Sequence, residues 1–497
     1  MAEKYLIGID VGTSGTKSVL FDTKGNVIAS ATEEYPLYQP HNGWAEQDPE
    51  DWWNAVCITL SKITQSVNTA EIAGIGLSGQ MHGLVMLDRN CNVIRKSIIW
   101  CDSRTARECE EIESLVGHDR LIEITANPAL AGFTASKILW VRNNEPENYS
   151  KCAHILLPKD YIRFKLTGEF ATEVSDASGM QLLDIPGRCW SDEVLEKLSI
   201  DKSLLAKVYE SPDITGYITD NASVVTGLPV GIPVAGGAGD NAAAAVGTGV
   251  VECGKAFTTV GTSGVVFAHM EKPVIDRSGR VHTFCTAVPG QWHVMGVTQA
   301  AGLSLNWFKK TIADNLSYKE IDAQAENIAV GADRLLYLPY LMGERTPVLD
   351  TNARGVFFGL SAIHTKAHMA RAVLEGVAFS LCDCLHVLSE MGVEAKDMAL
   401  CGGGAKSPLW RKILCDSFGV SVKTMESDEG PALGAAILGG CAAGIYSSVA
   451  EGCSIAVRDG KKLDPDVDNH KIYNTYYNIY KQIYPALKEQ YKNFAVI

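Results

Sequence analysis

The chain has little positive charge and no closely paired cysteine motif. Its 497 residues include 58 Asp and Glu against 44 Lys and Arg, which gives a formal net charge of −14 at pH 7. An acidic chain is poorly suited to a nucleic-acid backbone, whereas a nucleotide needs only a local positive potential. None of the 14 cysteines forms a C-x-x-C pair. We therefore expect no nucleic-acid partner, no zinc site, and free thiols in a reducing compartment.

The sequence also lacks an apolar run of membrane length. Its most apolar stretch, residues 432–446, is shorter than the roughly 20 residues that a membrane-spanning helix needs. The first residues lead directly into a strand pattern and lack the layout of a signal peptide. We therefore expect a cytoplasmic protein with no membrane partner, in which 432–446 forms a buried helix.

Two common nucleotide-binding motifs are missing in their proper context. Residues 74–79 match G-x-G-x-x-G, but a turn and another strand are predicted to follow, in place of the helix that would hold a pyrophosphate. Lys17 follows its glycines too early for a P-loop. The sequence therefore excludes a Rossmann oxidoreductase and a P-loop ATPase.

A pentapeptide that is present occurs twice, half a chain apart. Val-Gly-Thr-Ser-Gly stands at 11–15 and again at 260–264. A chain of this length exceeds one ordinary core, and such a match is what an ancient duplication leaves, although chance in a glycine-rich chain is the alternative. Each copy is predicted to form a strand–turn–strand whose hydroxyl and N–H groups hold phosphate oxygens. The candidate phosphate contacts are Gly12, Thr13, Ser14, Lys17, Gly261, Thr262 and Ser263.

Two carboxylates occupy positions where a charge needs a reason. Asp10 lies inside an apolar strand predicted over 5–12, where desolvation is costly unless a cation or hydrogen bonds compensate. Asp240 follows glycines at a predicted strand-to-helix turn, where backbone or ligand can approach closely. The same position suits a helix N-cap, so the residues alone leave both a cap and a chemical role open.

Polar and aromatic residues near the ends of predicted strands are further candidates. Met81 and His82 form a turn after one strand, where a structural histidine is the commoner case. Asp102 and Arg104 follow another strand closely enough to hold hydroxyl groups of a ligand. Trp44 could be a core residue or a wall stacked on a ligand.

Several segments have helix signals. Asp48 and Pro49 are typical of an N-cap and a first helical residue. Residues 133–140 and 158–161 look like helix openings, which by default lie on the surface. A tail helix carries one stripe of tyrosines, and we expect it to dock on the core; they are Tyr473, Tyr476, Tyr477 and Tyr480.

The second half of the chain contains a buried strand, 398–401, that runs into Gly402, Gly403 and Gly404 and then a helix. This arrangement suits an adenosine or phosphate that lies against bare backbone. The three glycines are therefore candidate nucleotide contacts. A charged loop at 343–347 has no role that its residues alone assign.

Taken in order, these motifs resemble the actin-like ATPase superfamily and, within it, the FGGY carbohydrate kinases. The resemblance covers essentially the whole chain. It implies an α/β protein of two ribonuclease-H-like domains of the actin/hexokinase type with a cleft between them. The N-terminal domain, 1–247, would bind sugar and phosphate, and the C-terminal domain, 248–497, would bind ATP. The segments that carry the resemblance are 9–21, 234–247, 260–267 and 401–415.

Within that family, four segments are similar to those of the kinases that act on D-xylulose: 44–49, 79–83, 157–161 and 343–347. The resemblance implies phosphorylation of D-xylulose to D-xylulose 5-phosphate by ATP with Mg²⁺. It implies that Met81 and His82 contact the ketopentose and that Asp240 is the proton acceptor, with Asn241 holding a substrate hydroxyl. Asp10 would lie near the metal and the phosphates.

Other functions stay open at this point. A kinase of the same family could act on ribulose, glycerol or another polyol, and the fold also carries ATP-driven chaperones and filament proteins. A non-catalytic sugar sensor would be expected to have lost Asp10 or Asp240, and both are present. At an ordinary pKa Asp240 would be ionised at pH 7. Relatives in the family are often dimers, so a homodimer is open as well, but the sequence shows no self-complementary patch and does not fix the oligomeric state.

Overall fold

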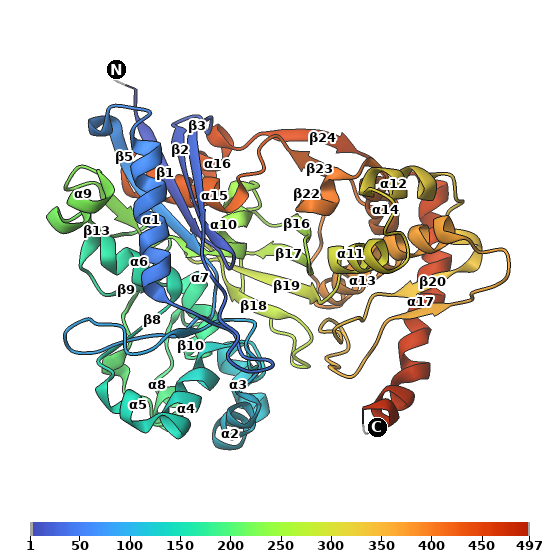
Figure 1. The fold of residues 1–497 in the computed structure, drawn as a ribbon, viewed down its shortest axis with the longest axis horizontal. Helices are drawn as coiled ribbons and strands as arrows, with labels where there is room; N and C mark the ends of the chain where they lie inside the picture. Colours follow the sequence, from blue (N-terminus) through green and yellow to red (C-terminus); the bar gives the residue numbers. More distant parts are fainter. Residues whose placement is uncertain (1–2, 496–497) are drawn as a thin grey trace.

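The computed structural model describes residues 3–495, which form two seven-stranded sheets, one from each half of the chain (Figure 1). The first sheet has the order β13-β14-β5-β1-β2-β3, and β15 also pairs with β5. Its strands are β1 (Tyr5–Val11), β2 (Gly15–Asp22), β3 (Val27–Glu34), β5 (Ile72–Gly79), β13 (Ile214–Tyr217), β14 (Pro233–Ala235) and β15 (Ala238–Gly239).

The second sheet repeats the central pattern of the first, in the order β18-β19-β17-β16-β22-β23-β24. In each sheet an antiparallel hairpin, β1–β2 or β16–β17, has a parallel strand beside its first member. The two copies of the pentapeptide form the turns of these hairpins, which confirms the predicted two-part α/β fold. The strands are β16 (Lys255–Val260), β17 (Gly264–Met270), β18 (His282–Cys285), β19 (Trp292–Thr298), β22 (Asp397–Cys401), β23 (Val422–Met425) and β24 (Asp459–Leu463).

Helices of the first half begin where the sequence predicts them. Asp48 caps α1 (Pro49–Thr64) by accepting a hydrogen bond from the Glu50 N–H. The predicted openings become α4 (Thr134–Asn144) and α6 (Pro158–Thr167), but most of their residues are buried. Their expected surface position is therefore wrong. The other helices are α2 (Ala106–Val116), α3 (His118–Thr125), α5 (Pro146–Lys151), α7 (Val174–Ala177), α8 (Asp192–Leu198) and α9 (Asp220–Thr226).

In the second half, the tail helix α17 (Val467–Phe494) docks on the core as predicted. Tyr473 and Tyr480 are each 1% exposed and pack with Phe379 of α13 (Lys366–Glu390). Figure 1 shows α17 in red, running down the right-hand part of the molecule to the C-terminus. The remaining elements include α11 (Gly302–Thr311), α12 (Tyr318–Glu326), α14 (Pro408–Phe418), α16 (Val449–Ala456), β20 (Leu336–Leu338) and β21 (Val356–Phe358).

Among residues 3–495, α13 is the one helix long and apolar enough to cross a membrane. Its most apolar window is 83% buried inside the protein, as in the core helix of a globular domain. The apolar stretch near residue 432 forms the shorter buried helix α15 (Gly430–Ala442), as predicted.

Two helices, α10 (Asp240–Gly247) and α15, lie between the sheets (Figure 1). Helix α15 belongs to the second half of the chain but packs on β1 and β5 of the first sheet. A Cβ on Gly76 would lie only 1.8 Å from the Ala435 carbonyl oxygen. Conversely, Ala245 of α10 lies in one core with Phe257 and Phe267 of the second sheet. Helix α15 thus packs on the sheet of the other half, and the two halves share an interior.

Candidate active site

Asp10 and Asp240 flank the end of β5. Asp10 of β1 pairs with Ser78 of β5 on one side, and β15 pairs with Ser78 and Gly79 on the other. Asp240 follows β15 directly. The Ser78 hydroxyl donates to Asp10 Oδ1 at 2.8 Å. Because parallel strands end at the same edge of a sheet, both carboxylates face the crevice where ligands of such sheets bind.

Asp240 does not cap α10. It is the first helical residue, while Gly239 occupies the N-cap position and no side chain caps the helix. The Asp240 Oδ1 atom accepts hydrogen bonds from the backbone N–H and side-chain amide of Asn241, at 2.6 and 2.9 Å. The interpretation of Asp240 as a simple cap is therefore wrong, and its carboxylate is only partly buried.

Burial and charge change the acidity of both carboxyl groups. Burial, and to a lesser extent the nearby charge of Asp10, raise the pKa of Asp240 to about 7 against the opposing effect of the hydrogen bonds from Asn241. Burial also raises the pKa of Asp10, against the Ser78 hydrogen bond and the charge of Lys17. The expectation of an ordinary pKa for Asp240 is wrong. A carboxyl group poised near pH 7 is well matched to general-base work.

The Met81–His82 turn is held in an unusual backbone conformation. His82 has a backbone φ of 70°, which residues other than glycine rarely adopt. Its carbonyl oxygen accepts bonds from Lys137 Nζ at 2.8 Å and from the Thr134 hydroxyl at 3.1 Å. Both donors come from α4. This buried helix therefore fixes the turn.

The His82 ring is neutral and oriented. Burial and the charge of Lys137 lower its pKa to about 3. Its Nδ1 lies 2.8 Å from the Gly179 carbonyl oxygen, so Nδ1 carries the proton and donates. The unprotonated Nε2 is then free to accept a hydrogen bond from a ligand hydroxyl.

Met81 joins the His82 turn to the start of α10. A Cβ on Gly239 would lie 2.8 Å from Met81 Cγ, and a Cβ on Gly179 would lie 2.4 Å from His82 Nδ1. Only glycine at both positions allows this packing. The structure therefore brings Met81, His82 and Asp240 together, as the resemblance implies.

Asp102, Arg104 and Trp44 form a separate, closed cluster. The Arg104 guanidinium binds both carboxylate oxygens of Asp102 and also Glu46, at 2.7 to 2.9 Å. The Asp102 and Arg104 side chains are 0% and 1% exposed, and Trp44 covers the guanidinium at 3.7 Å. Their polar atoms are occupied by one another, so they do not support the expected direct contacts with ligand hydroxyls. They hold Trp44 in place instead.

Side chains brace the first hairpin turn. The Gln47 side chain donates to the Thr13 carbonyl oxygen at 2.7 Å, and the Trp100 indole donates to the Thr13 hydroxyl at 2.9 Å. Lys17 forms an ion pair of 2.5 Å with Glu429, the residue before α15. Lys17 therefore links the first hairpin to the second half of the chain, and Ser14 lies exposed at the tip of the turn.

The second hairpin turn borders a cavity of about 770 Å³. The Gly261 carbonyl oxygen accepts a bond from the Gly302 N–H at the start of α11, at 2.7 Å. Gly402 has φ 83° and leads into Gly403 and Gly404, which line the cavity with Gly261 and Thr262. Sequence reasoning missed further lining residues, because they come from separate elements with no local motif; among them are Asn306, Tyr318, Asp322 and Lys406.

The charged loop at 343–347 brings a cation toward His82 from the second half. Glu344 accepts bonds from the Thr298 hydroxyl at 2.6 Å and from the Gln299 N–H at 2.9 Å. The Arg345 guanidinium lies 3.3 Å from His282 Nε2, and its charge contributes to the low pKa of His82. The sequence marked this loop but gave Arg345 no role.

Asp10 is the carboxylate in this site that could hold a metal ion. Within residues 3–495 no group of three or more His, Cys, Asp or Glu side chains could hold an ion. Asp10 has one carboxylate oxygen bonded to Ser78 and keeps the other free. Protein-bound Mg²⁺ commonly uses one or two carboxylates together with substrate phosphates and water. Asp10 therefore fits a magnesium ion that arrives with phosphates.

Comparisons with known proteins agree with this geometry. Residues 5–247 match the model of the N-terminal domain of the FGGY family of carbohydrate kinases, and residues 256–443 match that of the C-terminal domain. A xylulose kinase of Bacillus subtilis is 40% identical over 98% of both chains. The structure of a ligand-bound xylulose kinase from Lactobacillus acidophilus has TM-score 0.93 at 29% identity, covering 99% of this chain and 100% of that one. A gluconate kinase from the same organism has TM-score 0.95 at 30% identity, with the same coverage. The chain therefore belongs to the FGGY family of carbohydrate kinases, phosphotransferases with an alcohol group as acceptor.

Proposed function

We propose that this enzyme transfers the γ-phosphoryl group of ATP to D-xylulose and forms D-xylulose 5-phosphate. The observation that carries the proposal is the packing of the Met81–His82 turn against Gly239, directly before Asp240. It joins a neutral histidine acceptor to a carboxylate with a pKa near 7. The Bacillus subtilis xylulose kinase, 40% identical over nearly the whole chain, supports this sugar.

In this mechanism Asp240 takes the proton of the attacking hydroxyl. Phosphoryl transfer has a loose transition state, so the enzyme contributes mainly by holding the acceptor in line and by stabilising charge. His82 Nε2 accepts a hydrogen bond from a second hydroxyl, and the Asn241 side chain, which bonds Asp240, also borders the acceptor. The base contributes about 10² to 10⁴ in rate.

ATP lies, in this proposal, with adenosine in the cavity beside Gly403 and Gly404 and with its phosphates toward the two hairpin turns. The N–H and hydroxyl groups of exposed Ser14 and Thr262 and of half-buried Ser263 are suited to phosphate oxygens. Magnesium, when bound with the nucleotide, neutralises those oxygens. Asp10 would hold the ion through the carboxylate oxygen to which Ser78 does not donate.

We also propose that sugar-binding residues belong to an N-terminal domain, 1–247, and nucleotide-binding residues to a C-terminal domain, 248–497. The two family models, which match 5–247 and 256–443, support this division. The homodimer stays a prediction, which light scattering after size exclusion would test.

Gluconate is the second candidate substrate. The gluconate kinase with TM-score 0.95 is as similar to this chain in fold as the xylulose kinases are. Ribulose and glycerol, which other members of the family accept, would use the same base and the same nucleotide cavity.

A coupled ADP-release assay with Mg-ATP tests the proposal against D-xylulose, D-ribulose, L-ribulose, glycerol and gluconate. We expect kcat/KM for D-xylulose to exceed the others by at least about tenfold, equal to roughly 1.4 kcal/mol of transition-state preference. A preference for gluconate would keep the mechanism and replace the substrate. No turnover on any of them would overturn the proposed function.

A further inference from the structure

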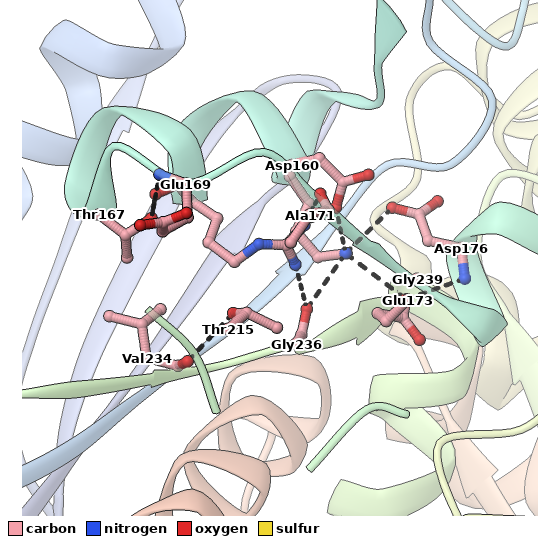
Figure 2. Close-up of polar contacts among 12 residues, drawn as sticks. Asp160, Thr167, Glu169, Ala171, Glu173, Asp176, Thr215, Val234, Gly236 and Gly239 are labelled. Carbon is pink, nitrogen blue, oxygen red and sulfur yellow. Dashed lines mark hydrogen bonds and ion pairs between the residues drawn. The ribbon is translucent and has the colours of Figure 1, made fainter. Parts of the chain in front are cut away.

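A buried cluster of charged side chains lies behind the turn that leads into Asp240. It consists of Lys159, Asp160 and Arg163 of α6, Glu173 at the end of β9 (Ala171–Glu173), and Asp176 of α7; we call it the Lys159 cluster. All five side chains are 0% or 1% exposed. Figure 2 shows Asp160, Glu173 and Asp176 gathered near Gly236 and Gly239.

The cluster and its neighbours hold the turn by three of its backbone groups. The Gly236 carbonyl oxygen accepts bonds from Lys159 Nζ at 3.3 Å and Arg163 Nη1 at 2.6 Å. The Gly239 N–H donates to the Ser175 hydroxyl at 3.1 Å. The Gly237 N–H donates to the backbone carbonyl of Ser211 at 3.0 Å. Each of the three glycines in the 236–239 turn is thus hydrogen-bonded to a residue outside the turn.

A single carboxylate organises the two serines. Glu173 Oε1 accepts a bond from the Ser175 hydroxyl at 2.9 Å, and Oε2 accepts one from the Ser211 hydroxyl at 2.8 Å. The same carboxylate accepts the Ser175 and Asp176 backbone N–H groups at the start of α7. Glu173 in turn lies 3.5 Å from Lys159 Nζ. The ion pair therefore connects through Ser175 to the backbone next to Asp240.

The same segment reaches the sugar side of the site. Two residues after α7, the Gly179 carbonyl oxygen accepts the His82 Nδ1–H bond. Asp176 of α7 lies 3.5 Å from Lys159 Nζ, and neither of its carboxylate oxygens has a hydrogen-bond partner among residues 3–495. Burial and the charges of Asp160, Glu173 and Asp240 raise its pKa well above the ordinary value. The segment that holds Asp176 beside Lys159 therefore also supplies, at Gly179, the carbonyl oxygen that orients the histidine.

Stability alone is a poor explanation for this arrangement. Well-packed apolar side chains commonly stabilise a core as well as a buried ion-pair network does, or better. What such a network supplies is a fixed geometry, because its members can satisfy their charges in few arrangements. Catalytic groups need that kind of support from the residues around them.

We propose that the Lys159 cluster positions the catalytic base: Lys159, Arg163 and Glu173, with Ser175 as the last link, fix the 236–239 turn so that Asp240 meets the substrate hydroxyl in line. They are positioning residues and do not touch the substrate. This inference rests on the proposed function in assigning Asp240 as the base.

Ser175→Ala is the first variant to make, because it removes the link to Gly239 and leaves every buried charge paired. We expect kcat on the preferred sugar to fall by about tenfold, since small displacements of a catalytic group are costly. KM for ATP should not change. Thr226→Ala in α9 is the matched control, because it also removes a buried hydroxyl bonded at 2.7 Å, far from the turn, and it should keep wild-type kcat.

A double-mutant cycle distinguishes positioning of Asp240 from any other effect. If Ser175 acts through Asp240, adding Ser175→Ala to an Asp240→Asn enzyme should cost less than about twofold more, because the interaction is already lost. An equal cost in both backgrounds, or wild-type kcat in Ser175→Ala, would overturn the inference.

Hydrogen exchange supplies a readout that does not depend on activity. Ser175→Ala should speed exchange of the amides at 236–240 by about tenfold while the β16–β17 hairpin is unchanged, since one end of the turn is released. Unchanged exchange at 236–240 would refute the positioning role. An inactive wild-type enzyme would instead refute the proposed function, and the exchange result would still decide the inference.

Discussion

The two hairpin turns share the sequence Val-Gly-Thr-Ser-Gly but have different surroundings. The first is braced by side chains, from Gln47, Gln80 and Trp100, and ends a strand that carries Asp10. The second is braced by the backbone of α11 and opens onto the cavity near Gly403. The first loop thus lies at the crevice that contains Asp10, and its copy lies at the cavity lined by Gly403 and Gly404. If both loops bind phosphate as proposed, their neighbours decide which part of the reaction each one serves.

The largest predicted effect lies beside the first turn. Asp240→Asn should lower kcat by about 10² to 10⁴, because the base is lost while the hydrogen bonds of Asn241 can persist. Steady-state assays with D-xylulose and thermal melting would measure it. The folded protein should remain intact, and KM for ATP should change little, because the second turn is untouched. An Asp240→Asn enzyme with more than about a tenth of wild-type kcat would remove Asp240 from the mechanism.

The pH dependence should also be a property of the first turn alone. Because the pKa of Asp240 is raised to about 7, kcat/KM should fall about tenfold per pH unit below that value as the base becomes protonated. A profile flat down to pH 5 would contradict this.

The raised pKa of Asp240 also affects stability. Stability should fall as the pH rises, whereas activity should increase. A carboxyl group whose folded pKa lies above its ordinary value binds its proton more tightly in the folded state. Its contribution to stability is therefore greatest below about pH 4 and is lost as the pH rises through about 7. Asp240→Asn should raise the melting temperature more at pH 8 than at pH 5, which calorimetry would measure.

Much of the fold could be predicted from the sequence. The paired turns, the helix that starts at Pro49, the three-glycine turn at 402–404 and the docking tail are all local patterns, and the structure contains each of them. Local patterns succeed here because turn chemistry, caps and apolar stripes act over a few residues.

The failures come from contacts between distant segments. The sequence around Lys159 and Asp160 is typical of the start of a helix, which by default lies on the surface. No neighbouring residue in the sequence indicates that Glu173 and Gly236 contact Lys159 in the interior. For Asp240 the residues alone left a helix cap and a chemical role open and gave an ordinary pKa, because both its burial and the nearby charge of Asp10 depend on the fold. The packing of α15 on the sheet of the other half of the chain has no local signal in the sequence either.

A pair of alanine variants should sharpen the contrast at the second turn. A Cβ on Gly403 would meet nothing within 4 Å, whereas one on Gly404 would lie 2.4 Å from Val260 Cγ1. Gly403→Ala should therefore keep the melting temperature and raise KM for ATP by about tenfold, because the methyl group occupies space that the nucleotide needs. Gly404→Ala should lower stability by about 1 to 3 kcal/mol through overpacking. Equal melting temperatures and equal KM values would argue against adenosine at this surface.

The smallest effects should come from the threonines of the two turns. The Thr13 hydroxyl already bonds the Trp100 indole at 2.9 Å, while the exposed Thr262 hydroxyl has no partner among the residues that the structure describes. A hydrogen bond contributes about 0.5 to 1.5 kcal/mol, or roughly two- to tenfold in rate or affinity. Thr262→Val should raise KM for ATP by that factor without changing stability, because a bond to phosphate is lost. Thr13→Val should lower kcat more than it raises KM, because it loosens the turn that ends the Asp10 strand. If both variants changed the same kinetic constant equally, the two turns would have the same role toward ATP. The proposal that the two turns have different roles would then be wrong.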